Sequence, residues 1–398
     1  PDASLTPVAH VFKVATDQFV GKLSMLKVHQ GTFSSSTALY LDGVKKPVKL
    51  AHILRVNGKK QDEIPEAVPG DIVAVAKIEE LGFDSVLHGQ DIDHLRLKPL
   101  DMPRPMYGLA ILPKNRGDER KFSSALQKIL QEDPTVALVR GGATGELVLR
   151  TIGELHMRIV LEKLQNRFNI EVETSPPKIA YRETIRGKAD GHHRHKKQTG
   201  GAGQFGEVYL RVEPLESEDA ELEFVDETVG GSVPKQFMPA IEKGIRKAMN
   251  EGALAGYPIH GVRVAVYDGK HHSVDSKEVA FVAAGRKAFL EAVKKANPAI
   301  LEPIVDVEIT APSGALGDIN GLIATKRGQV KTSEYLPGDL AVIHARAPLG
   351  EMSAFSGELK SITHGQGTFV LDYSHYEPAP AQVQQELQAA FKPEAEED

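Results

Sequence analysis

The chain has 398 residues, of which 41% are hydrophobic and 26% are charged, and its formal net charge at pH 7 is −6. This composition is typical of a soluble globular protein of about two to four domains, and the charge excludes a uniformly basic nucleic-acid binder. The absence of cysteine excludes disulfides, thiolate metal sites and cysteine nucleophiles, and it fits a reducing cytoplasm. No apolar run approaches the roughly 20 residues that span a bilayer, and the first residues show no signal peptide. We therefore expect a cytoplasmic protein without a membrane partner.

The acidic charge is concentrated at the C-terminus. Glu394, Glu396, Glu397 and Asp398 contribute −4 of the net charge of −6 and leave −2 for residues 1–393. A nearly neutral body can still carry a local basic surface. Because the first residue is Pro1, we also expect a chain that starts inside a longer protein or is processed.

Residues 1–100 carry short runs in which apolar and polar residues alternate. The runs lie at 8–14, 21–28, 38–41 and 71–75, and Gly, Pro and Asn separate them. Alternation with a period of two and no helical segment predicts a small β-barrel. The following cluster, Pro103-Arg104-Pro105, predicts an extended linker, because two prolines fix φ and restrict the residues before them.

Residues 104–177 predict a ferredoxin-like domain with the element order β-α-β-β-α-β. Apolar residues recur on one helical face at 122–130 and at 157–168, and alternating strands flank both segments. His156 stands at the start of the second helix, where we expect a packed or capping histidine rather than a metal ligand.

Residues 301–378 repeat this order and predict a second ferredoxin-like domain. Its two helices are expected at 317–326 and 352–362, and its central hairpin turns at Pro337-Gly338. We expect Lys326 and Arg327 to complement the dipole of the helix that ends there. The last segment, 379–398, predicts a short Gln/Ala/Leu stretch and a frayed acidic tail.

Residues 178–300 predict an α+β domain with a glycine-tipped hairpin and two helices, which makes the whole chain a multidomain α+β protein. Pro234 suits the first turn of the first helix. Asp275 with Glu278 three residues later predicts a capping box for the second helix. Before that cap, a strand at 262–266 ends in a polar turn, which we expect to lie beside the glycine tip.

The stretch 193–209 is the candidate functional site, because a cationic arm leads into four glycines within residues 200–206. Glycine allows close approach to a partner, and glutamine amides can read nucleic-acid edges. The alternative is a solvated, flexible hairpin with an incidental basic flank. The candidate RNA-binding residues of the loop and the second turn are Arg194, Lys196, Lys197, Gln198, Gly200, Gly201, Gly203, Gln204, Phe205, Lys270, His271 and His272.

Several catalytic motifs are missing from the sequence. It has no phosphate-binding loop, no dinucleotide fingerprint that opens a helix, no nucleophile elbow and no H-E-x-x-H helix. We therefore expect no catalytic residue and no cofactor in this chain. The alternative is a metal-dependent enzyme that uses His192, His193, His195, His271 and His272. The neighbouring cations and the lack of suitably spaced carboxylates disfavour a metal site.

A series of local strings resembles the part of bacterial elongation factor G that follows its GTPase domain, and the resemblance covers essentially the whole chain. The strings follow the order of that family's domains, which makes the resemblance specific. They are GKL at 21–23 with Val28 and Gly31, PGDIVAV at 69–75, EDPT at 132–135, GELH at 153–156, AYRETI at 180–185, QTGGAGQFG at 198–206, VDS at 274–276, EPI at 302–304 and KRGQ at 326–329.

The resemblance implies a ribosome-binding portion of a translational GTPase that promotes tRNA and mRNA translocation and ribosome recycling. The loops at 198–206 and 270–274 would then face the codon–anticodon duplex in the decoding site of the small ribosomal subunit. The implied partners are rRNA of both subunits, the tRNA–mRNA complex, a recycling factor and the chain's own GTPase domain. GTP and Mg²⁺ would bind in that absent domain, so this chain alone would not hydrolyse GTP.

Three departures from the family pattern indicate an elongation factor G-like paralogue at least as strongly as the housekeeping factor. The family commonly has Arg where Ala202 stands and Ser-Gly where Arg150-Thr151 stands. In the second loop, His271 and Ser273 flank His272, where Tyr and Asp are usual. A ribosome-protection or recycling specialist is therefore the alternative within the family.

Overall fold

The computed structural model describes residues 2–17, 20–41, 44–50, 52–58, 60–89, 97–141, 144–197, 203–215 and 220–392. The chain divides into two compact units, Pro1–Lys178 and Ile179–Asp398. Within the described residues, none of the helices combines the length and the apolar character needed to cross a membrane.

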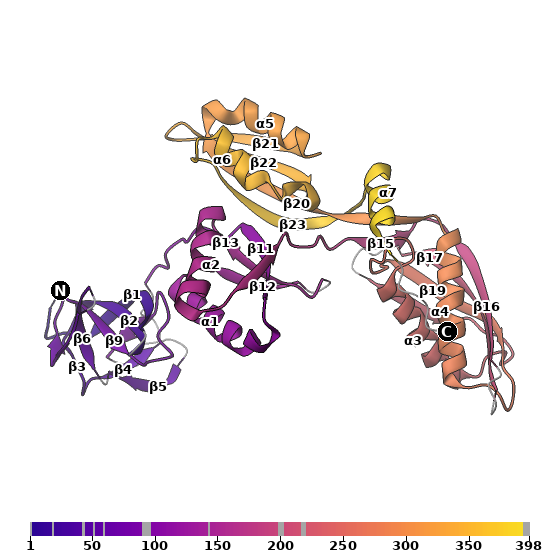
Figure 1. Ribbon diagram of the computed structural model, residues 1–398, viewed down its shortest axis with the longest axis horizontal. Coiled ribbons are helices and arrows are strands. Elements are labelled where there is room, and N and C mark those ends of the chain that lie inside the picture. Colours follow the sequence, from indigo (N-terminus) through magenta and orange to yellow (C-terminus); the bar gives the residue numbers. More distant parts are fainter. Residues whose placement is uncertain are drawn as a thin grey trace. The chain divides into compact units, whose positions relative to one another are not determined.

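The first unit begins with an eight-stranded sheet of order β5-β4-β10-β1-β2-β9-β6-β7 and a short ladder of β3 with β8 (Figure 1). Leu26, Phe33, Leu39 and Leu87 are fully buried in its core, as the alternation of apolar residues predicts. In the described residues the sheet has two ends, at β5 and β7, so closure into a barrel remains a prediction. The strands are β1 Val8–Asp17, β2 Gly21–Gln30, β3 Phe33–Ser34, β4 Ala38–Leu41, β5 Val44–Lys49, β6 Ile53–Asn57, β7 Lys60–Ile64, β8 Glu66–Ala67, β9 Ile72–Ala76 and β10 Val86–His88.

The rest of the first unit has the predicted order β-α-β-β-α-β. Its antiparallel sheet has the order β12-β13-β11-β14, which is the ferredoxin-like arrangement, and the apolar faces of α1 and α2 pack against it. The elements are β11 Tyr107–Pro113, α1 Glu119–Glu132, β12 Ala137–Arg140, β13 Leu147–Thr151, α2 Glu154–Phe168 and β14 Val172–Ser175.

His156 lies in the first turn of α2 and connects two of the family-like sequence strings, GELH at 153–156 and EDPT at 132–135. Its Nε2 lies 2.9 Å from Oδ2 of Asp133, whose Oδ1 accepts hydrogen bonds from the backbone N–H and the hydroxyl of Thr135. Burial alone would raise the pKa of Asp133, but the hydrogen bonds from Thr135 and His156 outweigh it and lower the pKa. The expectation of a packed histidine is confirmed.

The second unit contains a five-stranded sheet built on one long strand, β20. β20 pairs with β15 through its first residues and with β22 through the remainder, while β23 runs antiparallel along it (Figure 1). The order β21-β22-β20-β23 repeats the ferredoxin-like arrangement, with α5 and α6 on its core. The elements are β15 Arg182–Ile185, β20 Pro298–Pro312, α5 Leu316–Thr325, β21 Gln329–Leu336, β22 Leu340–Pro348, α6 Phe355–Ile362, β23 Thr368–Pro378 and α7 Ala381–Ala390.

The basic residues after α5 do not merely complement its dipole, which corrects the sequence expectation. Both guanidinium Nη atoms of Arg327 donate to the nearly buried carboxylate of Glu302 at 2.7 Å, and its Nε donates to Glu351 at 2.9 Å. These hydrogen bonds raise the pKa of Arg327. Lys326 pairs with Glu358 at 2.8 Å. Sequence reasoning missed these pairs because every acid partner lies more than 20 residues away along the chain.

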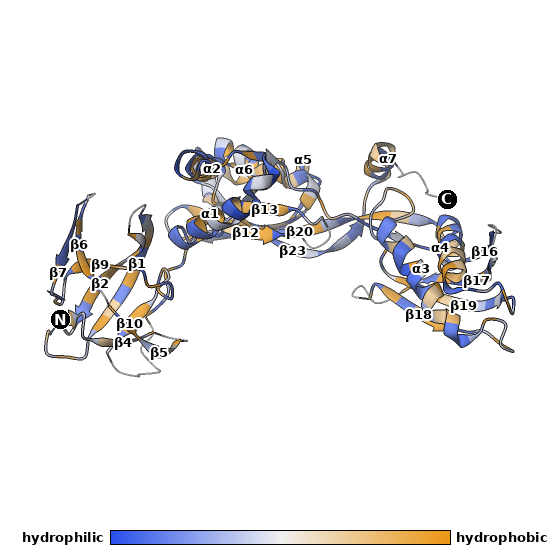
Figure 2. Cartoon of the chain, turned by 60° about the horizontal axis from the view of Figure 1, so that its bottom comes forward, coloured by the Kyte–Doolittle hydropathy of each residue, from blue (hydrophilic) through white to orange (hydrophobic). Residues whose placement is uncertain are grey.

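The second module of this unit is a four-stranded sheet of order β16-β17-β19-β18, with α3 and α4 on one face. α4 is mainly orange in Figure 2 because most of its residues are apolar. Gly244 and Gly285 let the two helices approach closely, since a Cβ at Gly244 would stand 2.1 Å from the carbonyl oxygen of Val282. The elements are β16 Ala189–Lys197, β17 Gln204–Pro214, β18 Leu222–Asp226, α3 Met238–Glu251, β19 Val262–Lys270 and α4 Glu278–Lys295.

A buried carboxylate connects β15 to the loop after α3. Glu183 is fully buried, and its side chain accepts hydrogen bonds from the backbone N–H groups of Ala253, Leu254, Ala255 and Tyr257 at 2.6–3.1 Å. Backbone donors satisfy both oxygens, which is how a carboxylate is tolerated without water. The loop therefore closes around this side chain.

We predict that Glu183→Gln lowers the unfolding free energy of the second unit by about 2–4 kcal/mol, because an amide NH₂ would face a backbone donor. Thermal unfolding measures the loss, and hydrogen exchange at Ala253–Ala255 localises it. Glu334→Gln, at an exposed position of β21, is the matched control. Equal melting and equal amide protection in the two variants would contradict the role of Glu183.

Candidate nucleic-acid interface

The candidate site lies on the hairpin of β16 and β17. Their register pairs Lys197 with Gln204, Lys196 with Phe205 and Arg194 with Glu207, so the two strands lead into the glycine loop as the sequence predicts. Three of the candidate residues, Gln198, Gly200 and Gly201, lie outside the described residues. The other candidates are described and come from the hairpin and from the segment that joins β19 to α4.

The side chains of the cationic arm, strand β16, point alternately to the two faces of the sheet. Directly paired residues lie on the same face of a sheet, and Val208 is in the core beneath the helices. His193 and His195, opposite Val208 and Gly206, therefore lie on the helix side. Gly206 is needed there, because a Cβ would stand 3.2–3.3 Å from the backbone of α4 at Ala280 and Phe281.

The opposite face of the sheet carries the side chains of His192, Arg194 and Lys196. None of the helices in the described residues covers this face. The three side chains stand opposite Tyr209, Glu207 and Phe205 of β17. We call this side the helix-free face of the sheet β16-β17-β19-β18.

The two polar loops lie beside each other, which confirms the sequence expectation. The backbone N–H of Phe205 donates to the carbonyl oxygen of Asp275 at 2.9 Å, and the hydroxyl of Ser276 donates to the carbonyl oxygen of Phe205 at 2.9 Å. A Cβ at Gly203 would stand 3.0–3.1 Å from the carboxyl group of Asp275. These hydrogen bonds fix the second loop to the start of β17.

The predicted capping box at Asp275 is wrong. α4 begins at Glu278, its N-cap is Lys277, and no side chain caps it. The Asp275 carbonyl and the Ser276 hydroxyl are bonded to Phe205 instead, and the Ser276 hydroxyl also accepts the backbone N–H of His272 at 2.8 Å. Asp275 therefore lies two residues before the N-cap and takes no part in capping α4. Likewise, Pro234 precedes a short 3₁₀ turn, and Pro239 occupies the first turn of α3.

His272 organises the second loop through one ring nitrogen. Its Nδ1 accepts hydrogen bonds from the backbone N–H groups of Val274 and Asp275 at 3.3 and 3.2 Å. An accepting Nδ1 leaves the proton on Nε2, so the exposed part of the ring presents a donor. The ring also meets Phe205 edge-on, with centroids 6.4 Å apart.

The cations of the site fall into two classes. Arg194 is held by the carboxylate of Glu207, with both Nε and Nη2 at 3.0 Å from its oxygens. Lys196, Lys197 and Lys270 are exposed, and within the described part of the chain they form no ion pair. Such lysines keep their charge available for an anionic partner.

Glu207 is the residue of this site that sequence reasoning missed. It is fully buried although it lies on the helix-free face, and it accepts hydrogen bonds from His192 Nε2 at 2.8 Å and the Tyr209 hydroxyl at 3.1 Å, besides Arg194. Burial raises its pKa, but these donors outweigh burial and lower the pKa overall. The alternation E-V-Y-L-R-V-E in β17 already placed Glu207 and Tyr209 on one face, which was the available signal.

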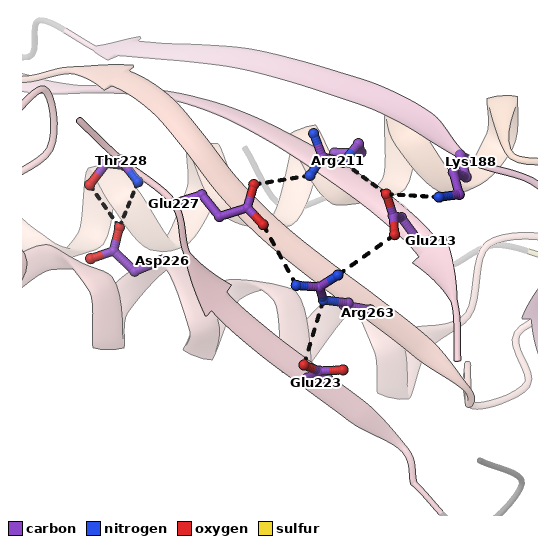
Figure 3. Close-up of polar contacts among 8 residues, drawn as sticks. All are labelled: Lys188, Arg211, Glu213, Glu223, Asp226, Glu227, Thr228 and Arg263. Carbon is purple, nitrogen blue, oxygen red and sulfur yellow. Dashed lines mark hydrogen bonds and ion pairs between the residues drawn. The ribbon is translucent and has the colours of Figure 1, made fainter. Parts of the chain in front are cut away.

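The lower part of the helix-free face is a network of paired ions (Figure 3). Arg211 pairs with Glu213 and Glu227, and Arg263 lies between Glu213, Glu223 and Glu227 at 3.5–3.8 Å. Lys188 also pairs with Glu213, at 3.3 Å. Each cation here is balanced, so this part offers little attraction to an anion.

The five candidate histidines do not converge. His192 stacks on Tyr209 on the helix-free face, whereas His193 and His195 lie on the helix side, and Nδ1 of His271 lies 3.4 Å from the carbonyl oxygen of Ser232. In the portion of the chain that the structure describes, no group of three or more histidine, cysteine or acidic side chains is arranged to hold a metal ion.

Four family models match consecutive segments of the chain. "Elongation factor G domain 2" matches residues 7–87, "Elongation Factor G, domain III" matches 102–176, "Elongation factor G, domain IV" matches 177–297, and "Elongation factor G C-terminus" matches 299–387. Among solved structures, the crystal structure of a protein from Thermus thermophilus is 37% identical, with a TM-score of 0.78. The match covers 96% of this chain and 57% of that protein.

The charge environment of His193 yields a prediction. Burial lowers its pKa first, and the neighbouring charge of Lys287 on α4 lowers it further. His193 should therefore be neutral at pH 7, and the folded state should lose stability as the pH falls below about 6.5, where the unfolded chain takes up the proton more readily. NMR titration of the His193 ring should give a midpoint below about 6.5, the ordinary value for histidine, and Lys287→Gln should move it upward.

Lys294→Gln, which removes an exposed charge from the last turn of the same helix, is the control and should leave the midpoint unchanged. A His193 midpoint above the ordinary histidine value, or equal midpoints in the two lysine variants, would show that α4 does not set the charge state of His193.

Proposed function

Because the chain belongs to the elongation factor G family, we propose that it is the ribosome-binding portion of a GTP-dependent translation elongation factor that promotes movement of tRNA and mRNA. The chain spans 57% of the length of the Thermus thermophilus protein that it matches. The nucleotide-driven step accordingly belongs to the longer parent protein. We place that protein in the cytoplasm, where ribosomes are.

The observation that carries the proposal is the construction of the tip. Two loops from different parts of the chain are bonded to each other at Phe205, and the exposed cations Lys196, Lys197 and Lys270 surround them. A narrow, glycine-rich end fits a crowded RNA groove, and unpaired lysines neutralise phosphates. We infer that this end approaches the codon–anticodon duplex and the RNA of the small ribosomal subunit.

The remaining segments have roles in this proposal too. We propose that residues 104–177 contact the GTPase domain and the small ribosomal subunit, whereas residues 301–378 contact RNA of the large one. GTP and Mg²⁺ would bind in the GTPase domain, because this chain has no phosphate-binding loop in its sequence. Ribosome recycling factor would be a further partner. We also propose that separate domains begin at residues 104, 178 and 301.

A ribosome-protection or recycling specialist is the second candidate. Two residues of the second loop, His271 and Ser273, depart from the usual family pattern, and His271 approaches the segment at Ser232. The parent protein, assayed for translocation and for splitting of ribosomes, distinguishes the two. A factor that splits ribosomes but does not move mRNA is the specialist.

We predict that the triple variant Lys196→Gln, Lys197→Gln, Lys270→Gln weakens binding of this chain to ribosomes roughly tenfold or more. Its binding should also depend less steeply on salt, by roughly 0.7–0.9 in the log–log slope for each lost phosphate contact. Co-sedimentation with ribosomes at several salt concentrations measures both effects.

The control variant is Lys243→Gln, Lys294→Gln, Lys360→Gln, which removes three exposed charges from α3, α4 and α6. The assignment of the tip fails if the two triple variants bind ribosomes equally well. The wider proposal fails if the parent protein neither binds ribosomes nor hydrolyses GTP faster in their presence.

A further inference from the structure

We propose that the upper half of the helix-free face, next to the tip, binds single-stranded RNA, with an unpaired base stacked on the ring pair of His192 and Tyr209 and phosphates held by Lys196 and Lys270. This surface, which we call the stacking face, adjoins the two tip loops and shares Lys270 with the second of them. The proposal rests on the proposed function, since it takes the ligand to be RNA of the translating ribosome.

The first observation is the ring pair itself. The rings of His192 and Tyr209 are stacked, with centroids 4.1 Å apart and planes inclined by 19°, and a second tyrosine, Tyr267, lies 6.3 Å from Tyr209. The His192 side chain remains 42% exposed although one face of its ring is covered. A parallel ring stack with an exposed member on a sheet is a platform on which a base of single-stranded RNA stacks, whatever its sequence.

The second observation is that a single buried group fixes these side chains. The carboxylate of Glu207 accepts hydrogen bonds from His192, Arg194 and Tyr209 at 2.8–3.1 Å. The rings and the guanidinium are therefore ordered before any ligand arrives, which removes part of the entropy cost of binding. Glu207 is a positioning residue in this proposal and does not itself touch RNA.

The third observation is the distribution of charge along the face. Lys196 stands opposite Phe205 and Lys270 stands opposite Glu207, and neither lysine has an ion pair among the residues that the structure describes. Cations thus alternate with rings from the tip to the ring pair, as in grooves that follow an RNA backbone.

Beside and below the ring pair the charges change. Asp268 stands opposite Tyr209 and Asp190 stands opposite Arg211, and the paired ions of Figure 3 follow. This acidic and balanced border would repel phosphates, so the RNA path ends at His192 and Tyr209. Because the attractive charges are exposed lysines interleaved with rings, RNA fits this face better than an acidic protein surface would.

The test uses the 398-residue chain with fluorescein-labelled octamers of adenylate and uridylate, measured by fluorescence anisotropy at low salt, and in parallel with ribosomes by co-sedimentation. Tyr209→Leu and His192→Gln should weaken octamer binding roughly tenfold, because each removes a stacking ring. Tyr209→Phe keeps the ring and should bind within about twofold of the unaltered chain. Glu207→Gln should weaken binding while both rings are retained.

Tyr335→Leu, at a 71% exposed tyrosine of β21, is the matched control and should change nothing. Melting curves of all variants confirm that they fold. If the unaltered chain binds ribosomes but not the octamers, or if Tyr209→Leu binds the octamers like Tyr209→Phe, the stacking face is overturned while the proposed function stands.

If Tyr209→Leu loses ribosome binding but keeps octamer binding, a ribosomal protein occupies the face and the RNA proposal is wrong. If the unaltered chain binds neither ribosomes nor octamers, the proposed function fails together with this one.

Discussion

Two hydrogen bonds at Phe205 hold the proposed functional end of the second unit together. The Phe205 N–H donates to Asp275 and its carbonyl oxygen accepts from Ser276, so a residue at the start of β17 is tied to the loop before α4. β17 lies between β16 and β19, and these bonds therefore also set where Lys196 and Lys270 stand. Through these bonds the start of β17 and the loop before α4 satisfy polar groups of each other.

Sequence reasoning predicted the repeated architecture well, because the signals are local and periodic. The helical spacing of apolar residues at 122–130 and the alternation in residues 8–14 depend only on near neighbours. The two ferredoxin-like orders followed from those segments. The pairing of the long strand β20 was harder to predict, since its first residues pair with β15, more than a hundred positions earlier in the chain.

The sequence indicated which segments form the candidate site, but not how their side chains interact. The adjacency of the two loops followed from their glycine and polar content, whereas the capping box at Asp275 failed because α4 begins at Glu278 with Lys277 as its N-cap. The same holds for Arg327, whose partner Glu302 lies 25 positions away. Local rules describe which groups are available, and tertiary packing decides which of them meet.

The long strand β20 has a mechanical consequence. Its 15 residues extend over about 50 Å at the usual rise of a strand, and β23 is bonded beside it for most of that length. A two-stranded ribbon of this kind resists bending, because bending it would strain many backbone hydrogen bonds together. The register shift between Ile304 and Val305 interrupts this ladder of hydrogen bonds, so bending would concentrate there. A force applied where β15 pairs with the first residues of β20 would therefore be transmitted along this ribbon to the part of the sheet that carries the helices α5 and α6.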